Sequence, residues 1–136
     1  LSQSKDQLAD NWIRLQFGRY TAFGLGHLGA EEKDSHTFIG LGGIIPRQLK
    51  GKQEYEIAYS LLPAHWGKGY GTEIAQTMRD FGFHHMSSDR FISIIDKENA
   101  RSQKVARKNG MKILFDTIYN DRAVDIYGIH SADSQR

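Results

Sequence analysis

Residues 54–73 read EYEIAYSLLPAHWGKGYGTE and change from a strand-like to a helix-like pattern within one segment. The first part, Glu54 to Leu62, predicts a strand, and Pro63 ends it because proline cannot donate a backbone hydrogen bond. Apolar side chains then recur every three or four residues, which predicts a helix from about Gly69 to His85. The apolar positions of this helix are Tyr70, Ile74, Met78 and Phe81.

The turn between this strand and this helix contains three alternating glycines, Gly67, Gly69 and Gly71. Glycine permits positive φ and lets a ligand approach the backbone closely. Amide groups at the start of a helix carry partial positive charge, so the turn predicts a phosphate-binding site, to which Lys68 adds a full charge. A tight turn without a ligand is the alternative interpretation.

Further strands and helices are expected on both sides of this segment. Before it we expect a helix over Lys5–Phe17, strands over Tyr20–Leu28 and Thr37–Ile45, a turn over Ala30–His36 and a basic hairpin loop over Pro46–Gln53. After it we expect a strand over Phe91–Ile95, a helix over Asn99–Asn109 capped by Gly110, and a hairpin of Lys112–Tyr119 with Ala123–Ile129. This order predicts a mixed α/β sheet, in which the strands joined by the Gly69–His85 helix are parallel neighbours or near neighbours.

The composition is that of one globular domain of 136 residues, with 39% hydrophobic and 25% charged residues. The absence of cysteine excludes disulfides, thiolate metal sites and cysteine nucleophiles, and it fits a cytoplasmic location. No apolar run approaches the roughly 20 residues that a membrane-spanning helix needs. The net charge of +2 is too weak by itself to indicate a nucleic-acid partner.

Two segments in the same chain resemble the GCN5-related N-acetyltransferase (GNAT) superfamily. Residues 55–73 resemble its cofactor-binding core, and residues 96–111, DKENARSQKVARKNGM, resemble the second signature of the ribosomal-protein N-terminal acetyltransferase (RimJ/RimL-like) branch. The resemblance covers about Phe38 to Ile129. It implies the acyl-CoA N-acyltransferase fold, a mixed and splayed central sheet flanked by helices, as a single domain over residues 1–136. The family's N-terminal strand is expected to be missing from this chain.

The resemblance also implies that acetyl-CoA, as co-substrate, lies in the opening of the splayed sheet, and no metal is expected. The backbone of Ser60 to Leu62 would pair with the pantetheine arm, and residues 67–72 would hold the pyrophosphate. Asn99 would bond the pantetheine amides, although it could equally be a helix N-cap. The predicted cofactor-binding residues are Ser60, Leu61, Leu62, Trp66, Gly67, Lys68, Gly69, Tyr70, Gly71, Thr72 and Asn99.

Acetyl transfer to an amine needs a neutral amine, a polarised carbonyl and a thiolate that can leave. Glu56 is the candidate base for the ammonium, and an outward-facing surface carboxylate is its alternative interpretation. Ser102 is the candidate to protonate or hydrogen-bond the sulfur, and a residue that satisfies the first helical turn is the alternative. Many relatives use a helical tyrosine as acid, but Asn99–Asn109 contains none, so Tyr59, Tyr119 and Tyr127 are further candidates.

The predicted function is therefore N-acetyl transfer from acetyl-CoA to a primary amine, on a protein N-terminus or a small molecule, by direct attack in a ternary complex. The alternatives are a non-catalytic CoA-binding regulatory module and a basic nucleic-acid-binding domain. The basic cluster of the second signature either forms a solvated helix face or attracts the 3′-phosphate of the cofactor. It consists of Arg101, Lys104, Arg107 and Lys108. No nucleic-acid or membrane partner is expected, and the sequence leaves a homodimer and the acceptor amine open.

Overall fold

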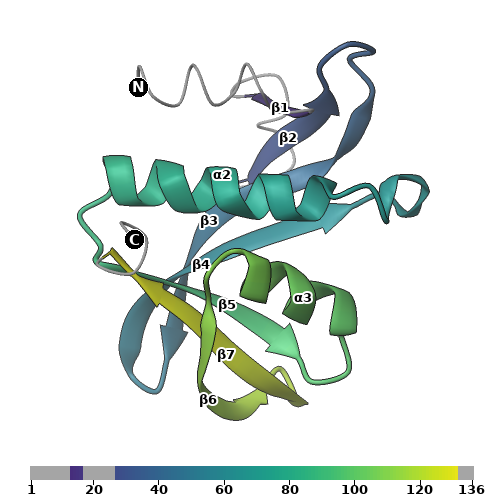
Figure 1. The fold of residues 1–136 in the computed structure, drawn as a ribbon. Helices are drawn as coiled ribbons and strands as arrows, with labels where there is room; N and C mark the ends of the chain where they lie inside the picture. Colours follow the sequence, from purple (N-terminus) through teal and green to yellow (C-terminus); the bar gives the residue numbers. More distant parts are fainter. Residues whose placement is uncertain (1–12, 17–26, 132–136) are drawn as a thin grey trace.

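The computed structural model describes residues 13–16 and 27–131, which form one mixed sheet with two α-helices packed on it (Figure 1). The elements are β1 (Ile13–Gln16), β2 (His27–Glu32), β3 (Phe38–Leu49), β4 (Lys52–Leu61), the short 3₁₀ helix η2 (Pro63–His65), α2 (Tyr70–His85), β5 (Arg90–Asp96), α3 (Ala100–Lys108), β6 (Lys112–Tyr119) and β7 (Arg122–His130). The seven strands lie in the order β1-β2-β3-β4-β5-β7-β6.

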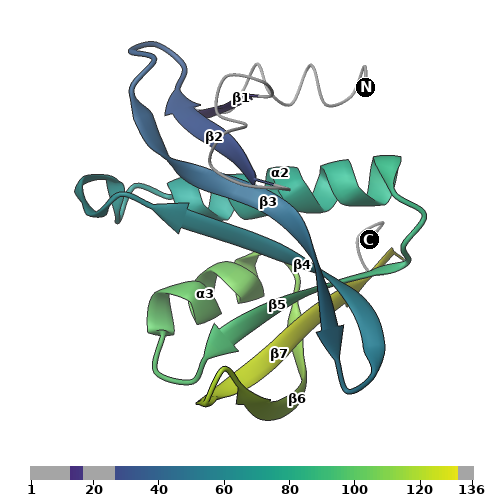
Figure 2. The same cartoon turned by 180° about the vertical axis from the view of Figure 1, so that it is seen from behind.

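The sheet divides at the junction of β4 and β5. Every other neighbouring pair is antiparallel and shares several residues of register, whereas β4 and β5 are parallel and share only the pair Glu56↔Ile92. The two strands separate beyond this pair, with α3 beside the opening (Figure 2). The predicted mixed, splayed sheet with parallel strands around the α2 crossover is thereby confirmed.

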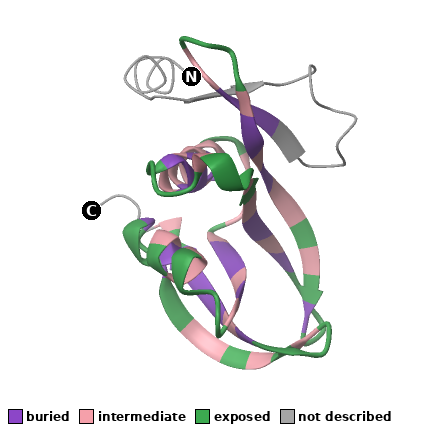
Figure 3. Cartoon of the chain, turned by 90° about the vertical axis from the view of Figure 1, so that its right-hand side faces the viewer, coloured by how far each residue is buried: buried purple, intermediate pink, exposed green. Residues whose placement is uncertain are grey.

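Both helices pack on one face of the sheet, and the main core lies between them and the strands (Figure 3). Phe91, Ile57 and Ile74 are at most 2% exposed, and each such side chain contributes about 1.5–3 kcal/mol on burial. Helix α2 approaches the sheet closely at Gly82, where a Cβ would lie 2.6 Å from Cζ of Phe91. A second cluster forms from strand residues alone, and because strand side chains alternate it lies on the other face. Its buried members are Leu49, Ile92, Val124 and Ile126.

Three sequence predictions were wrong where the structure describes those residues. Ile13–Gln16, expected in a helix, is a strand at the sheet edge, because it pairs with β2. The expected turn begins later, since Ala30 to Glu32 still belong to β2. The rest of the expected first helix, and most of the strand expected over Tyr20–Leu28, lie outside the described residues. The expected absence of an N-terminal strand stays a prediction.

The third error concerns the hairpin between β3 and β4, which has a two-residue turn and no basic loop. Lys50 and Gly51 both have positive φ, 50° and 74°, as a tight strand-to-strand turn requires. Pro46 lies inside β3, paired with Tyr55. Among the described residues β2 pairs with β3 only as far as Gly43, so no described strand lies beside Pro46 on that edge and its missing N–H costs no ladder bond there.

Candidate functional site

The glycine-rich turn leads from η2 into α2 with two glycines in the left-handed region. Gly67 has φ 80° and Gly69, the N-cap of α2, has φ 82°. A Cβ at either position would meet no atom within 4 Å, so the backbone torsion, and not crowding, requires glycine here. These torsions set the direction in which the following amide groups point.

The amide groups of this turn are left without protein acceptors. The first backbone hydrogen bond between α2 and the turn runs from the Glu73 N–H to the Gly69 carbonyl, at 3.1 Å. For the amides of residues 67–72, no acceptor is found in the described part of the chain. Gly69 also has no side chain that could cap them. The start of α2 is therefore an anion-binding geometry of the kind predicted.

A groove of about 380 Å³ lies between this turn, the end of β4 and the first turns of α3. It is lined by Tyr59, Ser60, Leu61, Trp66, Gly67, Gly69, Tyr70, Gly71, Thr72, Asn99, Arg101, Ser102, Lys104, Val105 and Lys108. Three basic side chains of α3 thus face the groove, whereas Arg107 of the same helix does not. The groove is long, open and positively charged along one wall.

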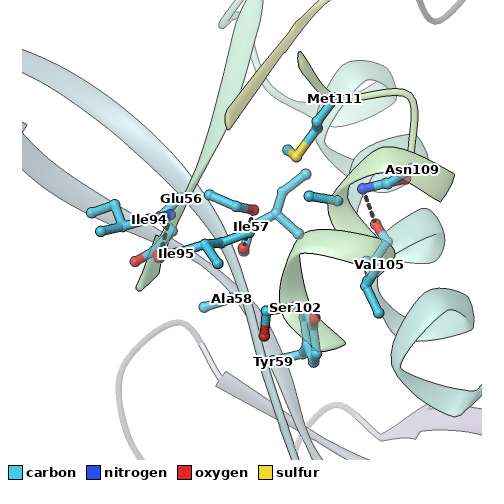
Figure 4. A pocket seen from close by; sticks show the side chains of 13 residues that line it. Glu56, Ile57, Ala58, Tyr59, Ile94, Ile95, Ser102, Val105, Asn109 and Met111 are labelled. Carbon is cyan, nitrogen blue, oxygen red and sulfur yellow. Dashed lines mark hydrogen bonds between the residues drawn. The ribbon is translucent and has the colours of Figure 1, made fainter. Parts of the chain in front are cut away.

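A smaller cavity of about 90 Å³ lies deeper, inside the splay between β4 and β5 (Figure 4). A water molecule takes up about 30 Å³ in the liquid, so the cavity has room for a small group only. Tyr59, Ser102 and Val105 line both the cavity and the groove, and they mark where the two spaces meet. The cavity is also lined by Glu56, Ile57, Ala58, Ala75, Ser93, Ile94, Ile95, Ala106, Asn109 and Met111.

Glu56 is a buried carboxylate, 8% exposed, so its interpretation as a surface residue is wrong. Its Oε1 accepts a hydrogen bond from Nε of Arg47 at 2.9 Å, and its Oε2 accepts one from the Ile94 backbone N–H at 3.1 Å. Burial disfavours the Arg47 charge, but the hydrogen bond and the charge of Glu56, together with Tyr119, outweigh this and raise the pKa of Arg47 above its ordinary value. Glu56 is therefore held in one orientation at the wall of the cavity.

A second side-chain bond joins β4 and β5 at the splay. The buried Ser93 Oγ donates to the Ile57 carbonyl at 2.8 Å. The Ser93 side chain lies on the same face as Phe91 and Ile95 of the main core, whereas Glu56 alternates with Ile57 of that core, so the two bonds lie on opposite faces of the sheet. Side chains, and not a backbone ladder, thus hold the two strands together where the cavity opens.

Comparison with known proteins identifies the family. A family model described as the acetyltransferase (GNAT) domain matches residues 2–112. The chain belongs to this family. GNAT acetyltransferases take the acetyl group from acetyl-CoA and act on amine substrates.

Individual relatives and solved structures agree with this assignment. YkkB of Bacillus subtilis, named an uncharacterized protein, is 33% identical over 100 residues, which are 74% of this chain and 58% of YkkB. The aminoglycoside acetyltransferase AAC(6')-Ib in complex with coenzyme A has the same fold, with a TM-score of 0.68 at 13% identity over 82% of this chain and 70% of that one. A SpeG spermidine N-acetyltransferase mutant of Vibrio cholerae has a TM-score of 0.68 at 16% identity, over 99% of this chain and 74% of that one. The chain spans about half the length of the curated relatives it matches.

Most residues predicted for the GNAT cofactor site line the groove, but Leu62 and Lys68 do not. The Leu62 N–H donates to the Ile39 carbonyl at 2.8 Å, so it is committed to β3. The backbone groups of successive residues point to opposite edges of a strand. Because Leu62 points to β3, the backbone groups of Tyr59 and Leu61 point to the other, open edge of β4. The Leu61 carbonyl there accepts a hydrogen bond from the Trp66 indole at 3.2 Å.

Asn99 and Ser102 lie together at the start of α3. The Asn99 side-chain oxygen accepts a hydrogen bond from the Ser102 backbone N–H at 3.1 Å, so the interpretation of Asn99 as an N-cap is confirmed. Asn99 also lines the groove, where its amide group can still donate to a ligand. Ser102 lines the groove and the cavity, which places its hydroxyl at their junction.

Two contacts that brace the turn could not be predicted from any motif in the sequence. The Tyr70 hydroxyl donates to Oε2 of Glu32 at 2.5 Å, which ties the start of α2 to β2. This bond is the main reason that the pKa of Tyr70 is raised to about 12 and that the pKa of Glu32 lies below its ordinary value. At the mouth of the groove the Arg101 guanidinium lies 3.6 Å from the centre of the Trp66 ring, a cation–π contact between the turn and α3.

Two adjacent histidines lie at the end of α2. His84 and His85 belong to its last turn, where the sequence predicted the helix to end, and their rings contact each other. In residues 13–16 and 27–131, no group of three or more His, Asp or Glu side chains could hold a metal ion. None of the helices that the structure describes is both long and apolar enough to cross a bilayer.

Proposed function

We propose that this GNAT domain transfers the acetyl group of acetyl-CoA to a primary amine by direct attack in a ternary complex, as in the ribosomal-protein N-terminal acetyltransferase (RimJ/RimL-like) branch. The observation that carries the proposal is the set of amides of residues 67–72, which have no acceptor among the described residues and lie at one end of a groove that leads to the splay. Such amides favour a diphosphate, because they supply several donors and the helix dipole at one point. A cytoplasmic location is part of the same proposal.

In this proposal the cofactor lies along the groove with its diphosphate at the turn. The pantetheine arm runs beside the open edge of β4, bonded to backbone groups near Ser60 and Leu61 and to the Asn99 amide. Its acetyl end reaches the junction of groove and cavity. A small acyl group fits the cavity, because about 90 Å³ are free there. Arg101, Lys104 and Lys108 on the groove wall favour a polyanionic ligand over a neutral one.

Glu56 is proposed as the group that removes a proton from the acceptor ammonium, through a water molecule. Both of its oxygens already accept one hydrogen bond, and each oxygen has a second lone pair for water. The fixed orientation supports this role, because a base must be held within hydrogen-bond reach of the proton that it takes. Ser102 is proposed to hydrogen-bond the sulfur, since its hydroxyl is at the junction.

A thiol-release assay with acetyl-CoA tests the proposal. The acceptor panel contains spermidine, an aminoglycoside and a peptide with a free N-terminal alanine, so that polyamine, antibiotic and protein-like amines are all represented. We expect one class to release thiol well above the rate without amine. Glu56→Gln should lower that rate near neutral pH while acetyl-CoA still binds. Binding of acetyl-CoA with no amine-dependent release would support a non-catalytic CoA-binding module instead.

A further inference from the structure

Tyr59 occupies the junction between the groove and the cavity, and it comes from β4, not from a helix. Its hydroxyl oxygen is completely buried and makes no hydrogen bond of ordinary geometry in the part of the chain that the structure describes, although the Ser102 side chain is close enough to interact with it. Buried polar groups almost always have a partner, because an unpaired one loses the hydrogen bonds that water would make. A buried hydroxyl that lies between two ligand-sized spaces is therefore explained best by a partner on the ligand.

The ring of Tyr59 is fixed relative to the glycine-rich turn. A Cβ at Gly71 would lie 3.3 Å from Cε2 of Tyr59 and 3.6 Å from Val105, so the absence of a side chain at Gly71 makes room for the ring. Gly71 belongs to the first turn of α2, whose amides form the proposed diphosphate site. The distance between that site and the Tyr59 hydroxyl is consequently set by direct packing.

Ser102 is the polar neighbour of the Tyr59 hydroxyl. Both side chains enter the cavity at the same end, one from β4 and the other from α3 (Figure 4). Burial raises the pKa of Tyr59 above its ordinary value, and the contact with Ser102 offsets only part of this shift. A phenol whose pKa is raised in this way keeps its proton at neutral pH, and a phenol is a far stronger acid than a serine hydroxyl.

We infer that the Tyr59 hydroxyl protonates the departing sulfur, and that Ser102 positions this hydroxyl; the inference rests on the proposed function. As the new C–N bond forms, the C–S bond breaks and its electron pair goes to sulfur. The sulfur takes the Tyr59 proton and leaves as a thiol. The nitrogen of the attacking amine loses a proton as the amide forms. Water or Ser102 passes this proton to the Tyr59 phenolate. Helix α3 contains no tyrosine, and β4 supplies one at the same opening.

Three variants of Tyr59 and its neighbours test the inference. Tyr59→Phe keeps the ring that packs on Gly71 and removes only the hydroxyl, so we expect unchanged acetyl-CoA affinity by calorimetry and a kcat about 10²-fold lower. Tyr55→Phe is the matched control, because Tyr55 lies on the same strand and its hydroxyl bonds only the exposed Gln53 side chain. It should keep the kcat of the unmodified protein. Ser102→Ala should lower kcat less than Tyr59→Phe, and Ser102→Thr should restore it.

Replacement of Tyr59 by a ring-fluorinated tyrosine adds a readout that does not depend on deleting a group. Its phenol is more acidic, so the fall of kcat at alkaline pH should begin at a lower pH, and Tyr59→Phe should lack this dependence. A Tyr59→Phe protein that binds acetyl-CoA and keeps its kcat would overturn the inference. So would a fluorinated protein whose kcat falls at the same alkaline pH as that of the unmodified protein. Failure of the unmodified protein to bind acetyl-CoA would instead overturn the proposed function.

Discussion

The carboxylate of Glu56 on β4 accepts a hydrogen bond from the Ile94 backbone N–H on β5, at 3.1 Å. A side chain thus takes the place of a ladder bond where the two strands share their single register pair. The Ser93–Ile57 bond holds the opposite face of the same junction. The width of the opening into which acetyl-CoA is proposed to bind therefore depends on a few buried polar contacts.

Replacement of Arg47 should destabilise the protein, because it leaves the buried Glu56 carboxylate without its counter-ion. The Arg47 side chain is 35% exposed, so for Arg47→Met we expect a loss of about 1–3 kcal/mol in the free energy of unfolding, below the range for fully buried pairs. Lys97→Met is the control, since the Lys97 ion pairs with Asp116 and Asp125 lie at the surface and should contribute little to stability. Urea denaturation measures both, and equal losses would contradict a special role for the Arg47–Glu56 pair.

Alanine at Gly69 should damage both stability and cofactor binding. Gly69→Ala forces a non-glycine residue to φ 82°, which costs about 1–2 kcal/mol. If the turn relaxes to avoid this strain, the amides no longer converge, and acetyl-CoA affinity should fall about tenfold or more. Gly51→Ala carries a similar strain, at φ 74° in the β3–β4 turn, and should leave affinity unchanged. Calorimetric titration of the two variants separates backbone strain from loss of the site.

The basic wall of the groove should contribute to affinity through charge. We expect Arg101→Ala to weaken acetyl-CoA binding about three- to tenfold, with a smaller effect at high salt, because screening reduces such attraction. Arg107→Ala removes the same charge from the same helix but from outside the groove, and should change affinity little. Equal effects of the two substitutions would show that the whole helix acts only as a solvated basic face.

The Tyr70–Glu32 hydrogen bond should contribute to stability only within a pH window. The folded protein holds the Tyr70 proton up to a pKa of about 12, against an ordinary value of 10.0, so the contribution is lost as pH rises from about 10 to 12. The pKa of Glu32 lies below its ordinary 4.5, so the contribution is also lost as pH falls through that lower value. The urea midpoint of the unmodified protein minus that of Tyr70→Phe should be constant near neutrality and shrink at both extremes. A difference that does not vary with pH would contradict this assignment.

The sequence predicted the part of the fold in which local signals are strong. The change of apolar spacing and the glycines set the limits of α2 to within one residue, Gly69–His85 against Tyr70–His85. The strand around Pro46 was not predicted, because proline is a turn signal in isolation and only the register of the strands shows that Pro46 pairs with Tyr55, on an edge that β2 does not reach in the described residues. Strand β1 was not predicted for a similar reason, since pairing with β2 decides the conformation of Ile13–Gln16.

Contacts between distant residues account for what the sequence could not show about the site. Period-two alternation places Glu56 on one face of β4, but it does not reveal that Arg47 of β3 and the Ile94 backbone of β5 bind its two oxygens. Glu32 lies 38 residues before Tyr70, and no motif connects them. Tyr59 was one of three candidate tyrosines, and only the shared lining of groove and cavity distinguishes it from Tyr119 and Tyr127.

The convergence of the residue 67–72 amides on a diphosphate is tested most directly by nuclear magnetic resonance of the backbone amides during titration. Coenzyme A and pantetheine, which lacks the diphosphate, are the two ligands. With coenzyme A we expect the largest shifts at the amides of Gly67, Gly69, Gly71 and Thr72, and with pantetheine these amides should barely move. Binding of coenzyme A that leaves them unshifted, or no binding at all, would contradict the assignment of this turn.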